Sequence, residues 1–115
     1  MPTPPEPPTE AQIYDMYQNL LDAINTEIFA TADPDVLHVL EPASQALTDL
    51  LDDEDMIHLE ANTALFAALT PKMKAANDAL KAAQAQIAAV ADKLANAGKV
   101  ISALTQVLTT TAKFA

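Results

Sequence analysis

The chain has 115 residues, which is enough for one modest domain and too few for an enzyme with a separate substrate lobe. It has no cysteine, so disulfides, thiol catalysis and cysteine-rich zinc sites are excluded. A net charge of −10, no arginine and only six basic residues disfavour nucleic-acid binding, and the single glycine excludes a glycine-rich phosphate loop. We therefore expect no bound nucleic acid, cofactor or metal.

The charges are divided unevenly along the chain. Residues 1–60 contain 14 acids and no basic residue, whereas residues 61–115 contain six lysines and two aspartates. In one arrangement the two halves attract each other as they fold, with the acids on solvated helix faces. In the other, an acidic surface survives folding and binds a basic partner. We favour the first arrangement and keep the second open.

A proline-rich arm and a capping signal introduce the first predicted helix. Five of the first eight residues are proline, which favours an extended arm over residues 1–8, ahead of a single helical domain over residues 9–115. Thr9 and Gln12 have the spacing of a capping box, so a helix should begin there. Apolar residues at spacings of three and four continue this helix to about Thr31; they are Ile13, Tyr17, Leu20, Ile24 and Ile28.

A second helix and an acidic turn follow. Asp33 and Pro34 are a typical N-cap and first helical residue, which predicts a helix over about residues 34–51. Pro42 lies inside this helix and should bend or break it near Glu41. The next four residues are all acidic: Asp52, Asp53, Glu54 and Asp55. They lack the alternating spacing and the glycine of a calcium loop, so we interpret them as an exposed turn that caps the following helix.

The second half of the chain contains a heptad of large apolar residues, which keeps one face of a helix apolar and requires another helix to cover it. Its members are Leu59, Phe66, Met73, Leu80, Ile87, Leu94, Ile101 and Leu108. The heptad predicts a helix over about residues 56–111. Thr70 and Pro71 are a good N-cap pair, but the heptad passes them without a shift, so this helix is either kinked and continuous or broken at Pro71.

These patterns predict an all-α fold, a helical hairpin or bundle in which two acidic N-terminal helices pack on a long heptad-patterned C-terminal helix. A continuous helix of this length would extend beyond the two shorter helices and leave part of the heptad uncovered. We therefore expect an exposed interaction seam towards the C-terminus, through which the chain binds itself or a helical partner. The seam residues are Leu80, Ile87, Leu94, Val100, Ile101, Leu104, Val107 and Leu108.

Catalytic residues are almost absent from the sequence. His38 with Glu41, and His58 with Glu54, have spacings that place each pair on one helical face. Such pairs arise by chance in an acidic helical chain, so we expect no enzyme activity.

Three functions without catalysis remain open. The heptad favours an interaction or assembly protein, and the acidic half, with residues 52–55 as its surface, favours an inhibitor, immunity or adaptor protein for a basic partner. The alanine-rich C-terminal helix supports a secreted component that inserts into membranes. The N-terminus shows no signal-peptide pattern, and the longest uncharged run, residues 100–112, is too short to span a bilayer. We expect a cytoplasmic protein, or one exported without a conventional signal peptide, and no membrane partner.

Overall fold

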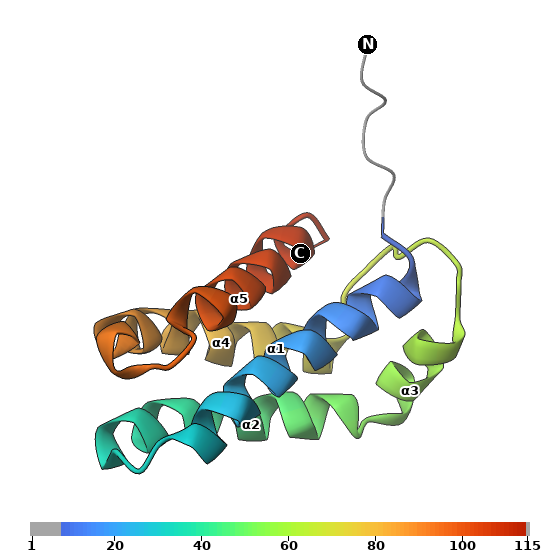
Figure 1. Ribbon diagram of the computed structural model, residues 1–115. Helices are drawn as coiled ribbons and strands as arrows, with labels where there is room; N and C mark the ends of the chain where they lie inside the picture. Colours follow the sequence, from blue (N-terminus) through green and yellow to red (C-terminus); the bar gives the residue numbers. More distant parts are fainter. Residues whose placement is uncertain (1–7, 115) are drawn as a thin grey trace.

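The computed structural model describes residues 8–114, and within that range it contains helices and no β-strand (Figure 1). Helical residues make up 79% of this part of the chain, which confirms the all-α prediction. In chain order the helices are α1 (Glu10–Ala30), α2 (Pro34–Leu51), α3 (Glu54–Ala61), α4 (Pro71–Ala89), the short 3-10 helix η1 (Ala91–Lys93) and α5 (Ala97–Ala112). Of the predicted proline-rich arm only Pro8 belongs to the described range, and residues 1–7 lie outside it.

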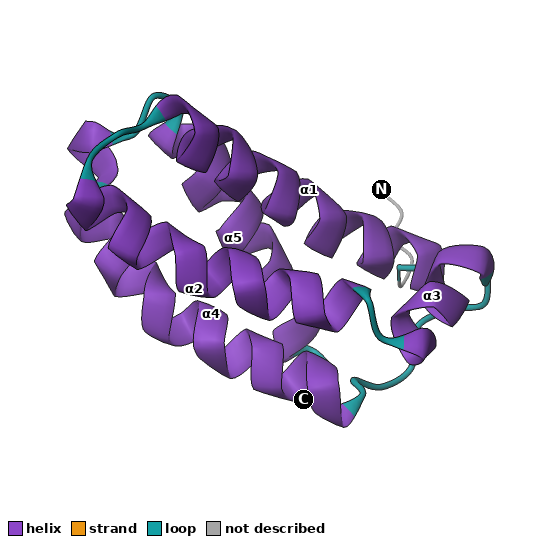
Figure 2. Ribbon diagram, turned by 90° about the horizontal axis from the view of Figure 1, so that it is seen from below, coloured by secondary structure: helices purple, strands orange, loops and turns teal. Residues whose placement is uncertain are grey.

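The long helices α1, α2, α4 and α5 form a bundle in which successive helices run in opposite directions (Figures 1 and 2). Helix α1 packs on α2, α2 on α4, α4 on α5, and α5 returns to α1. The short helix α3 lies at one end of the bundle and packs mainly on α1. The molecule is therefore an up-down-up-down helical bundle, an architecture that surrounds one apolar core with four helix faces.

Helix starts follow the predicted capping signals. The Thr9 hydroxyl accepts the Gln12 N–H at 3.2 Å, and the Gln12 side chain accepts the Thr9 N–H at 2.9 Å, so the capping box at the start of α1 is confirmed. Asp33 caps α2 by accepting the Asp35 N–H at 2.9 Å, with Pro34 as the first helical residue. These side chains satisfy backbone donors that have no partner inside the helix.

The second helix is not broken near Glu41, because α2 runs from Pro34 to Leu51 through Pro42. A proline inside a helix removes the hydrogen bond to the carbonyl four residues earlier, here that of His38. Both His38 and Pro42 are exposed, so the missing hydrogen bond lies on the solvent side of α2.

The predicted single helix over residues 56–111 is wrong, and the chain breaks twice within it. The first break covers residues 62–70, where the Asn62 side chain accepts the Ala64 N–H at 2.8 Å and so replaces helical hydrogen bonding. A new helix then starts at Pro71, capped by Thr70, which agrees with the broken alternative. The second break covers residues 90–96 and had no proline to signal it.

The breaks divide the second half of the chain into helices of about the same length as the helices of the first half. Helices α1, α2, α4 and α5 have 21, 18, 19 and 16 residues, so each can be covered along its whole length by its neighbours. A rod of about 55 residues would have no such cover at its far end. The heptad is therefore satisfied inside the chain.

The seam predicted from the heptad is not exposed in this structure. Six of its members are buried: Leu80, Ile87, Leu94, Val100, Leu104 and Val107. Ile101 and Leu108 are partly buried against the same core. The surface assigned to a partner helix thus faces the chain's own helices α1 and α2.

Candidate interaction surface

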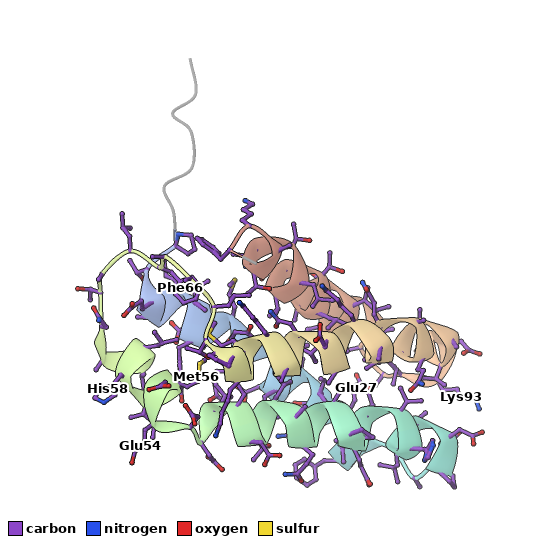
Figure 3. The ribbon with its side chains drawn as sticks, turned by 180° about the vertical axis from the view of Figure 1, so that it is seen from behind. Glu27, Glu54, Met56, His58, Phe66 and Lys93 are labelled. Atoms are coloured by element: carbon purple, nitrogen blue, oxygen red, sulfur yellow. The ribbon has the colours of Figure 1, made fainter. Side chains whose placement is uncertain are left out.

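Helix α3 has one face against the bundle and one face in solvent. Met56 and Leu59 are buried, and Figure 3 shows Met56 on the bundle side of the helix while Glu54 and His58 point away from it. The exposed residues with large side chains form what we call the α3 surface: Glu54, Asp55, Ile57, His58 and Glu60.

Ile57 is the apolar centre of the α3 surface. Ile57 is 52% exposed, and it is the one large apolar residue of the α3 surface. Helical spacing places Glu54 one turn before it and Glu60 one turn after it. Leu65, in the segment that follows α3, is also exposed. The arrangement combines an apolar contact point with flanking negative charge.

The four consecutive acids of the α2–α3 turn divide into two groups. Asp53 caps α3 by accepting the Asp55 N–H at 3.0 Å, and it forms an ion pair of 2.7 Å with Lys72 at the start of α4. The hydrogen bond from Lys72, followed by the one from the Asp55 N–H, lowers the pKa of Asp53 below its usual value. Asp52, Glu54 and Asp55 are exposed, as the capping interpretation expects.

The acidic region extends from α3 onto α1. Burial raises the pKa of Tyr14, and the nearby carboxylates of Glu60, Asp15 and Asp52 raise it further. These three acids come from α3, from α1 and from the turn after α2, and all of them are exposed. Negative charge from three segments thus converges at this end of the molecule.

Attraction between the acidic and basic halves is confirmed at two places. Besides the Lys72–Asp53 pair, Lys93 lies 3.6 Å from Asp33 and 3.5 Å from Asp35 at the opposite end of the bundle. Most other acids of α1 to α3 remain in solvent; they are Asp15, Asp22, Glu41, Asp49, Asp52, Glu54, Asp55 and Glu60. Ion pairs between the two halves and exposed acids are therefore both present in the folded chain, and binding of a basic partner stays a prediction.

The two histidine–glutamate pairs lie on the surface. His38 and Glu41 on α2 are exposed, and so are His58 and Glu54 on α3. Within residues 8–114 no group of three or more histidine, aspartate and glutamate side chains is arranged to hold a metal ion.

A buried polar network was missed by the reading of the sequence. The Tyr17 hydroxyl donates to Asn77 Oδ1 at 2.7 Å, Asn77 Nδ2 donates to Thr111 Oγ1 at 3.1 Å, and Thr111 donates to the Val107 carbonyl at 2.6 Å. It links α1, α4 and α5. The available signal was Asn77 itself, a polar residue four positions after Met73 on the apolar face of its helix.

Comparison of the chain with known protein families, characterised proteins and solved structures finds no significant match. None of the helices in the described part of the chain combines the length and apolar character needed to cross a bilayer.

Proposed function

We propose that the protein is an interaction protein without enzyme activity, and that it binds a basic partner through the α3 surface. The observation that carries this proposal is the half-exposed side chain of Ile57 between Glu54 and Glu60. It favours the acidic adaptor or inhibitor among the functions open from the sequence. The heptad seam gives less support to assembly, because six of its eight residues are buried in the chain's own core.

The chemistry of the surface selects the partner. An exposed isoleucine contributes binding energy when a partner's apolar side chain covers it. The surrounding carboxylates attract lysine or arginine at the rim and repel acidic surfaces, which affects association rate and selectivity more than total affinity. A helix or loop that presents one apolar side chain among basic residues fits both features.

A designed peptide tests the proposal directly. We would titrate the ¹⁵N-labelled protein with a helical lysine–leucine peptide and with the same peptide carrying glutamate in place of lysine. Only the lysine peptide should shift α3 resonances. Ile57→Ser should weaken its binding by about tenfold, the equivalent of about 1.4 kcal/mol.

Matched variants separate the α3 surface from general acidity. Phe29→Ser removes another exposed apolar side chain, at the far end of α1, and should leave affinity unchanged. Glu54→Gln with Glu60→Gln should weaken binding more than Asp22→Asn with Glu41→Gln, which removes the same charge elsewhere. Equal losses from the two charge pairs, or equal shifts over the whole acidic half, would refute a defined α3 surface.

A further inference from the structure

Helices α4 and α5 enclose a second feature, a cleft of about 290 Å³ on the lysine-bearing half of the molecule. It is built from elements other than α1 and α3 and so is independent of the α3 surface. Its volume lies just below the range of small-molecule sites, which starts at roughly 300 Å³. We propose that this α4–α5 cleft binds a small carboxylate with a short apolar body.

The polar part of the cleft is held in a fixed orientation. Asn77 and Thr111 line it, and both side chains are buried. Because the Tyr17 hydroxyl donates to Asn77 Oδ1, the amide nitrogen must face the other way, towards Thr111. That nitrogen carries two hydrogens, and within residues 8–114 it donates one hydrogen bond, to Thr111 Oγ1. The second hydrogen has no acceptor among the described residues, and Asn77 is one of the residues that line the cleft.

The charges of the cleft match a single negative charge. Lys74, Asp78 and Lys81 line it from one face of α4, where spacings of three and four bring them together. In the described part of the chain the two lysines form no ion pair, unlike Lys72 and Lys93. Two lysines and one aspartate leave a net charge of +1, which favours a carboxylate over a phosphate that carries about −1.5 to −2.

The remaining wall of the cleft is apolar. Leu69 precedes α4, and Leu108 and Ala112 come from the last turns of α5. Leu69 and Leu108 are partly buried against the core, so their outer surfaces are still available for contact. A ligand with its carboxylate at the lysines and an aliphatic body against these side chains would satisfy both parts of the cleft.

Octanoate is a suitable probe, with octan-1-ol as its neutral counterpart. In a titration of the ¹⁵N-labelled full chain, octanoate should cause saturable shifts confined to residues near the cleft on α4 and α5. Lys74→Gln and Lys81→Gln should each weaken binding by about threefold, in line with the modest strength of exposed ion pairs. Asp78→Asn should strengthen it, because it removes the one negative charge in the cleft.

Lys99→Gln is the control for the lysine variants, since it removes one positive charge from an exposed position outside the cleft lining. It should leave octanoate affinity unchanged. Octan-1-ol binding as tightly as octanoate, equal effects of Lys99→Gln and Lys81→Gln, weaker binding by Asp78→Asn, or no saturable shift would each overturn the proposal. None of these outcomes bears on the α3 surface, which has its own peptide and its own variants.

Discussion

At the residue scale, the buried carboxylate of Glu27 joins α1 to the connection before α5. The side chain is 2% exposed, and its two oxygens accept the N–H groups of Ala95 at 2.9 Å and Asn96 at 2.6 Å. The Asn96 side chain makes no capping hydrogen bond at the start of α5. Glu27 therefore supplies from another helix the acceptor that this connection lacks locally.

Glu27→Gln should destabilise the fold, because the amide keeps one acceptor oxygen and turns an N–H group towards the other backbone donor. We expect a loss of about 2 kcal/mol in the free energy of unfolding, the typical cost of leaving a buried polar group unpaired. Urea unfolding measures it, with Glu41→Gln as the control on an exposed position of α2. Similar values for the two variants would mean that the Glu27 hydrogen bonds contribute little.

Tyr17 makes stability depend on pH at the alkaline end. Burial raises its pKa to about 12. In the unfolded chain the Tyr17 phenol loses its proton near pH 10, whereas in the folded chain it keeps that proton at the same pH. The free energy of unfolding should therefore fall as pH rises from about 10 to about 12.

Tyr17→Phe isolates this contribution. The variant should be about 1 kcal/mol less stable near neutral pH, because Asn77 loses its donor, and it should show a shallower decline above pH 10. Parallel denaturant titrations at several alkaline pH values compare the two proteins. A decline of the same slope in the variant would assign it to other groups with a raised pKa, such as Tyr14, Lys72 and Lys93, and the inference about Tyr17 would be wrong.

The residues of the core could largely be read from the sequence, but their polar partners could not. Spacings of three and four identified Ile13 and Tyr17 as inward-facing, and both are fully buried. The bond from Tyr17 to Asn77 joins side chains 60 positions apart, and it depends on how the helices are aligned along the bundle. Periodicity shows on which face of its helix a residue lies. It does not show which residue of another helix lies at the same level along the bundle.

At the element scale, helix starts were predictable because their signals are local. Thr9, Asp33 and Thr70 each cap a helix through contacts within three residues. Neither break in the second half followed from the heptad, since a heptad specifies the buried face without specifying which helix covers it. At residues 90–96 the decisive contact is with Glu27, which is far away in the sequence.

A substitution at Leu94 tests whether a heptad residue still stabilises the fold where the helix is interrupted. It lies in the second break, yet it is only 9% exposed and belongs to the core. Leu94→Asp should lower the free energy of unfolding by about 3 kcal/mol, because it places an unpaired charge among apolar side chains. Ser102→Asp, at an exposed position of α5, should change it by less than about 0.5 kcal/mol. Equal melting temperatures of the two variants would show that the connection over residues 90–96 contributes little to the free energy of unfolding.

At the scale of the whole molecule, the buried seam changes the expected oligomeric state. We expected self-association because the heptad would leave an apolar seam in water. In the structure the chain's own helices cover that seam. Within residues 8–114 the large apolar residues that remain exposed are Phe29, Ile57 and Leu65, and they do not form a continuous stripe along one helix. Ile57 is, moreover, surrounded by acids, which oppose the pairing of two identical surfaces.

The protein should therefore be a monomer at low ionic strength when no basic partner is present, because a net charge of −10 per chain opposes close approach of two copies. Sedimentation velocity at low and high salt measures this. Any weak dimer that forms at high salt through Phe29, which is 88% exposed, should be removed by Phe29→Ser. A dimer that persists in low salt and in that variant would mean that the bundle opens and exchanges helices between chains, so that Val100, Leu104 and Val107 meet a second copy after all.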